Sequence, residues 1–378
     1  MKNQFDYTLR DTQATAVSPV APEDFDAQRY ADYELSLLER CRSFWQSKSG
    51  GVLVYRRMRV GEVFAEDAAD MKKSLAWQLG ALEASMKFKA DVPNFLEPWY
   101  GIGTAAAAFG LGYVWEKNQA PALNGKFATT EQALHCDTVP TADTPIGRHT
   151  LHMVEYFLEA TKGLLPVSYC DVQSPLNVAG NMVDTNNFLT DFYLAPENVA
   201  ALLDKISDIV IDFTQAQQRL IGDQLASPGH GFASSRAFAG FGMSDDNAVM
   251  ISAEHYVQLA APSLLKVGNA FGGAVFHSCG NWSGKCGHIA QLPNLRMADG
   301  AFTHSTDPSP NDTAPFPAAF ANSGVVLNAR MVGDVATIEQ KVRELWRPGM
   351  KLIVVTYCAT PEEQERAYEA IHGIVNSE

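Results

Sequence analysis

The stretch GAVFHSCGNW, residues 273–282, carries the pattern that decides how this chain folds. A short apolar run ends in a histidine and a cysteine and is then broken by Gly280, as expected where a buried strand gives way to a loop. Side chains two positions apart on a strand point to the same face, so His277 and Cys279 should share one face at a strand's carboxyl end. That edge is where α/β barrels build their active sites.

Similar short runs recur along the chain and alternate with helical stretches. They are rich in β-branched and aromatic residues, as strands buried on both faces should be: VSYCDV (167–172), VVL (325–327) and LIVVTY (352–357). Helices are expected to start at Pro196 and Pro361, because proline suits the first helical position. A further helix after Ser252 should kink at Pro262. The alternation predicts βα units on a parallel sheet.

The predicted fold class is α/β, as a (β/α)8 TIM-type barrel with an N-terminal helical extension. A doubly wound sheet would give the same alternation, but its phosphate-binding turn is missing, since Gly101 and Gly103 have no third glycine after them. Residues 1–88 are expected to form a leader and a helical prelude packed on the barrel, with helices near 22–48 and 65–87. Residues 89–378 are expected to form the barrel.

Composition excludes several classes of protein. The chain has 29 basic and 43 acidic residues and a net charge of −14, which repels phosphate backbones and anionic lipids. No nucleic-acid or membrane partner is therefore expected. No apolar run reaches the roughly 18 residues that span a bilayer, and residues 1–13 lack a signal-peptide core, so a cytoplasmic protein is expected. Six scattered cysteines favour free or metal-bound thiols over disulfides.

The third residue expected in a metal site is Cys358, which ends the run KLIVVTYC (351–358). The last strands of a closed barrel converge on one mouth, so Cys358 can join His277 and Cys279 there. Three protein ligands with an open fourth position are typical of a catalytic zinc. Two thiolates leave a soft, weakly acidic metal that suits another thiolate, which indicates alkyl transfer to sulfur.

Two alternatives to that site stay open. In the first, His277 and Cys279 simply pack in the core. In the second, Cys286 and His288 complete H-x-C-x6-C-x-H and close a structural zinc with His277 and Cys279. The second alternative is disfavoured because residues 283–292 resemble a helix start, which would turn these side chains away from the strand end.

Other polar residues that follow strands are further site candidates. The candidates for catalysis or substrate binding are Asp171, Gln173, Asp245, Asp246, Asn281 and Arg330. The candidates for a fourth metal ligand are Glu97 and Asp299. Arg330 could hold an anionic substrate tail through bidentate pairing. The aromatic, glycine-rich segment NFLEPWYGIG (94–103) suits a lid or a ligand wall.

In their order, these motifs resemble the zinc-dependent, corrinoid-linked methyltransferase branch of the uroporphyrinogen decarboxylase superfamily, which includes methylcobalamin:coenzyme M methyltransferases. The resemblance runs from about residue 90 onward. The segments that carry it are DVQSPLNVAG (171–180), LAPENVAALLDKI (194–206), GMSDDNAVMIS (242–252) and FHSCGNW (276–282), followed by Cys358.

The resemblance implies a barrel, a zinc cofactor, and methyl transfer from a corrinoid to a thiol or similar small-molecule acceptor. The donor would be methylcobalamin or a separate corrinoid protein that docks at the barrel mouth. True decarboxylases carry P-x-W-x-M-R-Q-A-G-R near the N-terminus, where this chain has VLVYRRMRVGEVF (52–64). A decarboxylase-like lyase acting on a tetrapyrrole and a non-catalytic corrinoid- or tetrapyrrole-binding member are kept as alternatives. A homodimer is left open.

Overall fold

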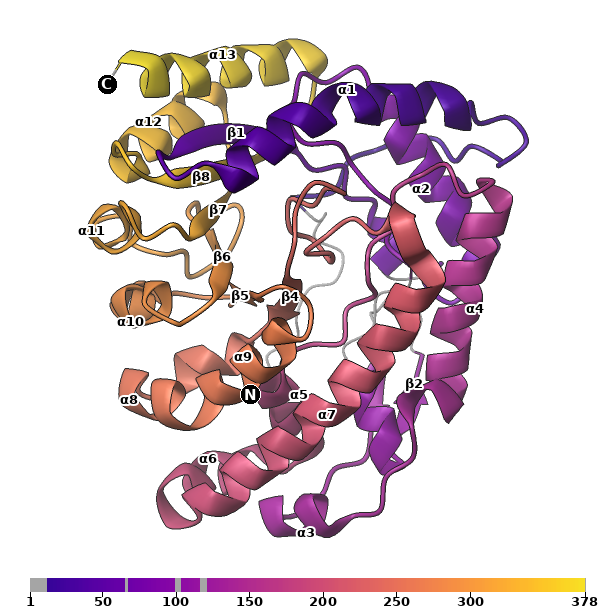
Figure 1. Cartoon of the computed structure of the whole chain (residues 1–378), viewed down its shortest axis with the longest axis vertical. Helices are drawn as coiled ribbons and strands as arrows, with labels where there is room; N and C mark the ends of the chain where they lie inside the picture. The colour runs from indigo at the N-terminus through magenta and orange to yellow at the C-terminus, as the bar shows by residue number, and fades with distance from the viewer. Residues whose placement is uncertain (1–11, 65–66, 99–102, 116–120, 378) are drawn as a thin grey trace, which may run out of the picture.

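Six parallel strands form one sheet in the order β1-β8-β7-β6-β5-β4 (Figure 1). The computed structural model describes residues 12–64, 67–98, 103–115 and 121–377. The strands are β1 Gly51–Arg56, β4 Phe241–Ser244, β5 Ala274–His277, β6 Leu295–Ala301, β7 Val326–Met331 and β8 Lys351–Thr356, with a separate antiparallel pair of β2 Gly112–Val114 and β3 Ala122–Asn124. Three expected strands, at 273–276, 325–327 and 352–357, are confirmed as β5, β7 and β8.

Between the two edges of this sheet, short extended segments continue the backbone pairing. The contacts run from Asp91 N to Val54 O (2.8 Å), through the parallel bridges Leu96 to Val167 and Val167 to Leu225, to Gly242 N bonded to Pro228 O (3.0 Å). The hydrogen bonds thus lead from β1 around to β4, as in the expected TIM-type barrel, although these segments are too irregular to be strands.

The expected strand at 167–172 is one of these irregular segments, and that prediction is wrong beyond the two bridges at Val167. Side chains take the place of a neighbouring strand here. The backbone N–H of Cys170 donates to the Gln217 side chain (2.8 Å), and the Asp171 carboxylate accepts from the backbone of Gln173 (3.0 Å). Gln173 itself has a φ of 60°, which ends the extended backbone in a turn.

The helices surround the sheet (Figure 1). They are α1 Ala27–Gln46, α2 Met71–Ser85, α3 Thr130–His135, α4 Pro145–Ala160, α5 Pro175–Met182, α6 Thr185–Leu194, α7 Pro196–Ile221, α8 Ala253–His255, α9 Ala261–Asn269, α10 Cys286–Ala290, α11 Phe316–Phe320, α12 Val335–Leu345 and α13 Pro361–Ser377. The expected starts at Pro196 and Pro361 are confirmed, and Ser252 caps α8 by accepting from His255 N. The kink expected at Pro262 takes the form of a π-helical turn, Tyr256–Ala260, just before it.

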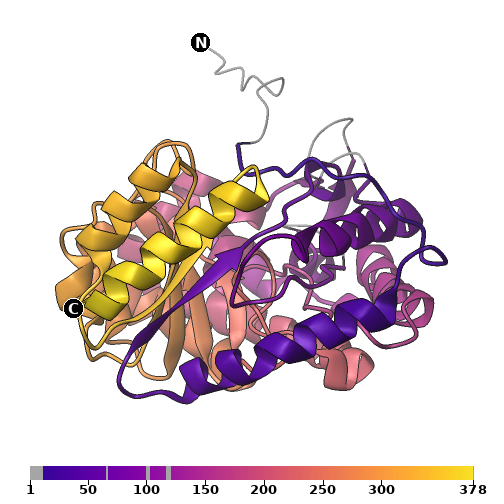
Figure 2. The same cartoon turned by 90° about the horizontal axis from the view of Figure 1, so that it is seen from above.

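The N-terminal segment holds a strand as well as helices. The two expected helices are present as α1 and α2, but β1 lies between them and pairs with β8 along its whole length. Residues 1–88 are therefore not wholly a helical prelude, because they contribute an edge of the central sheet; the boundary at residue 88 stays a prediction. Both α1 and α13 pack against β1, so the first and the last helix of the described chain lie along this strand (Figures 1 and 2).

Strand side chains alternate between two apolar clusters. Tyr55, Val275 and Val355 belong to a cluster that includes Phe232, whereas Val54, Phe276 and Val354 pack in the larger cluster with the helices. The smaller of these two clusters lies on the inner, concave face of the curved sheet. The same alternation continues just past the end of each strand. Side chains two or four residues after Val275 and two residues after Val355 therefore face inward at the barrel mouth.

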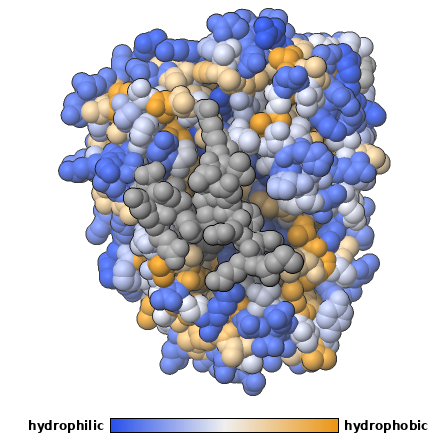
Figure 3. All heavy atoms as spheres, turned by 180° about the vertical axis from the view of Figure 1, so that it is seen from behind, coloured by the Kyte–Doolittle hydropathy of each residue, from blue (hydrophilic) through white to orange (hydrophobic). Residues whose placement is uncertain are grey.

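On the face shown in Figure 3, the coloured side chains are mostly hydrophilic, and apolar side chains lie among them in small groups. Large apolar side chains that are exposed, such as Tyr193 and Leu194 on α6, are few among the described residues. None of the helices in the described ranges is long and apolar enough to cross a membrane.

Candidate metal centre

His277 is the last residue of β5, and Cys279 follows it at the carboxyl edge of the sheet. Their side chains lie together, with the Cys279 Sγ 3.5 Å from the His277 Nε2. Both share the parity of Val275 and so point to the inner face, as the spacing of two residues predicts. The structure thus places two soft metal-ligand atoms side by side at the barrel mouth.

A third ligand atom comes from Asp246, at the start of the short helical turn Asp246–Met250 that follows β4. Its Oδ1 lies 3.5 Å from the His277 Nε2 and accepts a 2.7 Å hydrogen bond from the backbone N–H of Cys279. The ligand atoms of Asp246, His277 and Cys279 all lie within 4.8 Å of one another, the one such group found in the part of the chain that the structure describes. Sequence had assigned Asp246 to catalysis or substrate binding.

Asp299, on β6, orients the histidine from behind. Its Oδ2 lies 2.5 Å from the His277 Nδ1 and accepts from the Arg330 Nε at 2.9 Å, while Oδ1 accepts from the Asn328 side chain at 2.5 Å. Because Nδ1 faces this carboxylate, Nε2 is the nitrogen turned toward Cys279 and Asp246. Such a carboxylate behind a histidine is the usual outer partner of a metal ligand. Asp299, expected as a fourth ligand, occupies this supporting position instead.

His277 and Asp299 shift each other's pKa strongly. Burial alone would lower the pKa of His277, but the hydrogen bond and charge of Asp299, with a smaller contribution from Cys279, raise it to about 10. Burial likewise favours the neutral form of Asp299, yet the Arg330 and His277 charges lower its pKa to about 2. The two side chains therefore form an ion pair over the neutral pH range, and a metal would have to displace the proton on Nε2.

Cys358 does not join the metal group. Tyr357, not Cys358, continues the inward parity of Val355, and Cys358 packs in the outer cluster with the helices. The Cys358 thiol is 5% exposed, and burial raises its pKa to about 11 despite the nearby Arg56 charge. Its role as a metal ligand stays a prediction. Cys286 is also buried in the outer cluster, so the four-ligand closure with His288 finds no support among the described residues.

A network of buried polar side chains supports the Asp246 turn from below. Asp245 accepts hydrogen bonds from Ser174 and from the Tyr256 hydroxyl (2.7 Å), and burial raises its pKa to about 6. Asn177 donates to both Gln173 (3.1 Å) and Asp246 (3.1 Å). Asp245 and Gln173 therefore hold the loop that carries Asp246, which is a positioning role. The sequence predicted these residues as site candidates without separating them from the residues that reach the pocket.

A second polar wall stands across the mouth and was largely missed from sequence. His230 places its Nδ1 2.8 Å from Glu97 Oε1 and its Nε2 3.5 Å from Asp171 Oδ2. Glu97 also lies 3.6 Å from the Arg57 guanidinium; burial would raise the pKa of Glu97, but His230 and Arg57 lower it to about 2. Glu97 was predicted as a candidate fourth metal ligand and Asp171 as a catalytic or substrate-binding residue. In the structure both carboxylates contact the His230 ring and orient it.

Remaining candidates lie at the rim or outside. Asn281 is exposed, and its side chain accepts from Ser283, so it caps a turn next to the metal pair. In the predicted lid at 94–103, Asn94 is buried and bonded to the backbone of Arg56 (3.0 Å), while positions 99–102 lie outside the described residues. Asp307, which was not predicted, accepts from Gly280 N at 2.9 Å and fixes the loop after Cys279.

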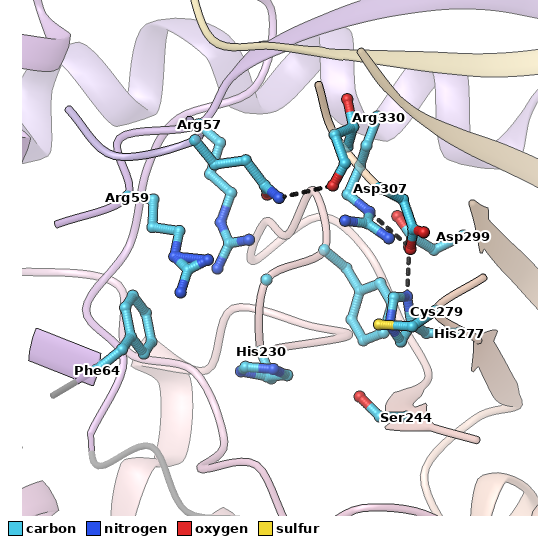
Figure 4. A pocket seen from close by; sticks show the side chains of 14 residues that line it. Arg57, Arg59, Phe64, His230, Ser244, His277, Cys279, Asp299, Asp307 and Arg330 are labelled. Carbon is cyan, nitrogen blue, oxygen red and sulfur yellow. Dashed lines mark hydrogen bonds and ion pairs between the residues drawn. The ribbon is translucent and has the colours of Figure 1, made fainter. Parts of the chain in front are cut away.

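These walls enclose a cavity of about 170 Å³ (Figure 4). His277, Cys279 and Arg330 lie on one side of it, and Arg57, Arg59 and Phe64 on the other, with His230 between them. The inner ring of Phe232 packs edge-on against both histidines, with ring centroids 5.9 Å from His277 and 6.5 Å from His230. The cavity thus combines soft metal-ligand atoms with a cationic rim.

Fold and site together define an α/β-barrel protein with a polar pocket at the carboxyl ends of its strands. Residues 87–224 match the model of the uroporphyrinogen decarboxylase (URO-D) family. Among solved structures, a methyltransferase from Methanosarcina mazei is similar, with a TM-score of 0.61 and 14% sequence identity over 90% of this chain and 98% of that one. No curated protein sequence matches. The family match is limited to residues 87–224, under half of the chain, and the similarity to the solved structure concerns the fold. The matched family segment ends before Asp246, so it does not include the metal group.

Proposed function

We propose that this protein is a zinc-dependent methyltransferase that moves a methyl group from a corrinoid to a small thiol. The observation that carries the proposal is the group of Asp246, His277 and Cys279, whose ligand atoms converge at the pocket while Asp299 orients the histidine. One carboxylate, one imidazole and one thiolate suit zinc, and three protein ligands leave a position for substrate. The similarity of the fold to a methyltransferase structure agrees with this chemistry.

Zinc bound there would hold the acceptor sulfur as a thiolate at neutral pH. The chain's own residues supply the rest. Arg330 is buried and its Nη2 has no hydrogen-bond partner in the described part of the chain, so it offers a donor to an oxygen on the acceptor. Nε2 of His230, between Glu97 and Asp171, is in place to take up the proton that the acceptor thiol loses. The rings of Phe64 and Phe232 limit the access of water.

The methyl donor has to approach from the open mouth, where the corrinoid would face the acceptor in line. Methylcobalamin itself or a corrinoid protein docked at the rim would fit the same chemistry, because the cobalt supplies the leaving group. The protein then contributes positioning and the exclusion of water.

Zinc content and turnover in the same samples test this proposal. We expect the purified protein to bind one zinc and to demethylate methylcobalamin in the presence of a suitable thiol, followed by the change in the corrinoid absorption spectrum. Cys279→Ala and Asp246→Asn should lose both, whereas Cys136→Ser, which changes a cysteine far from the site, should keep both. A protein that retains full zinc in Cys279→Ala would contradict the site.

The third ligand is decided by comparing two variants. If Asp246 completes the set, Asp246→Asn lowers zinc content and Cys358→Ala leaves it unchanged. If the sequence prediction for Cys358 is right, the loss occurs in Cys358→Ala instead, which would require the segment after β8 to turn its thiol inward.

Decarboxylation of a tetrapyrrole is the second candidate function. Buried Asp171, whose pKa is raised by burial, lies 3.5 Å from His230, which lines the pocket together with Arg57 and Arg59. The family model that matches is that of a decarboxylase. Incubation with uroporphyrinogen distinguishes the two functions: carbon dioxide release that persists after zinc is removed would favour this second activity.

A further inference from the structure

A second polar cavity lies at the opposite end of the sheet. It has a volume of about 460 Å³ and is formed where β6, β7 and β8 begin and where the chain enters β1. Arg296 is the second residue of β6, and Lys351 is the first residue of β8. The cavity is therefore at the amino ends of the strands, whereas the metal centre is at their carboxyl ends.

Two cations face this cavity without a counter-charge. No carboxylate of the described residues lies within ion-pair distance of Lys351 or Arg296, and none lines the cavity. Lys351 is 5% exposed; its ammonium donates to the Trp45 carbonyl at 2.7 Å and lies 5.2 Å from the centre of the Phe44 ring. The Arg296 guanidinium lies 5.6 Å from the Trp45 ring.

The surroundings of Lys351 disfavour its charged form. Burial, and then the charge of Arg296, lower the pKa of Lys351 to about 8. The wall residue Trp45 is also buried, and its indole N–H has no hydrogen-bond partner among the described residues. This unpartnered donor lies on the same wall as the two cations that have no counter-charge in the described part of the chain. Two cations kept beside each other, one buried and one half-buried, would be stabilised by an anionic ligand in this cavity.

We infer that this cavity, at the amino ends of β6 and β8, is a binding site for a small phosphate-like oxyanion held between Arg296 and Lys351. Arginine can pair two oxygens of such a group, and lysine adds a point charge. Exposed Lys48, which also lines the cavity, adds a third cation at its opening. The bound anion would relieve the repulsion between the two cations and link the amino ends of β6 and β8. The inference does not rest on the proposed methyltransferase activity.

Titration calorimetry of the full-length, zinc-free protein with inorganic phosphate tests the site, with sodium chloride of equal ionic strength as the blank. We expect one phosphate site, weakened tenfold or more in Arg296→Gln and in Lys351→Met, and retained in part in Arg296→Lys. Arg219→Gln, which removes an exposed arginine elsewhere, should leave binding unchanged. Sulfate and citrate titrations distinguish tetrahedral oxyanions from carboxylates.

The metal-centre pocket has arginines of its own, so Arg59→Gln serves as the second control. Phosphate binding that is lost in Arg59→Gln and kept in Arg296→Gln would place the anion in that pocket and overturn the inference. Absence of any heat beyond the chloride blank would also overturn it and would leave Lys351 and Arg296 as structural cations only. Circular dichroism of each variant separates loss of binding from loss of fold, and Arg296→Gln changes only a partly exposed side chain.

Discussion

At the scale of single residues, the hydrogen bond between His277 and Asp299 matters most. It decides which histidine nitrogen faces the candidate metal position. We expect Asp299→Asn to weaken zinc binding by about 10- to 100-fold, as loss of an outer carboxylate partner usually does. Competition with a chelating dye measures this change. Asp312→Asn, which alters an exposed carboxylate, is the matched control, and equal affinities in both variants would exclude the supporting role of Asp299.

The same residue pair gives a pH dependence. In the zinc-free protein the pKa of His277 is about 10, above its unfolded value, so its contribution to stability is full below about pH 6.5 and is lost as pH rises through 10. Zinc has to displace that proton, so its apparent affinity should rise about tenfold per pH unit from this group between pH 7 and 9. Chelator competition at several pH values checks the slope, and a flat profile would contradict a protonated His277.

The side chains around the candidate metal centre show how much of a site residue patterns can predict. The i, i+2 spacing correctly placed the side chains of His277 and Cys279 together, because strand geometry alone fixes that relation. His230 could not be found in this way, since its partners Glu97 and Asp171 are far away in sequence and meet it only through the fold. The one local signal was its place between two glycines, Gly229 and Gly231, both with positive φ.

Among the elements, β8 shows how strand prediction succeeds while side-chain direction fails. The run 351–358 predicted the strand correctly from its β-branched residues. The strand's alternation, however, sends Val355 and Tyr357 inward and leaves Cys358 in the outer cluster. The failure at 167–172 has the opposite cause: an equally strand-like sequence meets side chains such as Gln217 where a neighbouring strand would be. Neither outcome is encoded in the segment itself.

The packing of β4 against the loop that carries His230 and Phe232 leads to a prediction about stability. A Cβ on Gly242 of β4 would lie 2.3 Å from the Phe232 ring, which separates His230 from His277. We expect Gly242→Ala to lower the free energy of unfolding by about 1–3 kcal/mol, because the ring has to move in a packed interior. Urea denaturation measures it. Gly287→Ala, where an added Cβ meets nothing within 4 Å, should be neutral or stabilising.

At the scale of the whole molecule, a similar fold is found in a protein whose sequence is largely different. The similarity to the Methanosarcina mazei methyltransferase covers 90% of the chain at only 14% identity, so the architecture persists while most side chains differ. A shared barrel does not fix an activity. The proposed activity therefore has to be tested at the mouth of the barrel, first at the group of Asp246, His277 and Cys279.

Zinc should also stabilise the molecule as a whole, because Asp246 and the pair His277 and Cys279 follow different strands and meet only in the folded chain. Free zinc at 100 times its Kd would add about 2.7 kcal/mol. With about 2.1 cal/mol/K of unfolding entropy per residue over 378 residues, Tm should rise by about 3 °C. Calorimetry of the chelated protein with and without added zinc measures the shift. Cys136→Ser should keep it and Cys279→Ala should lose it, whereas an equal rise in both variants would mean that zinc binds elsewhere.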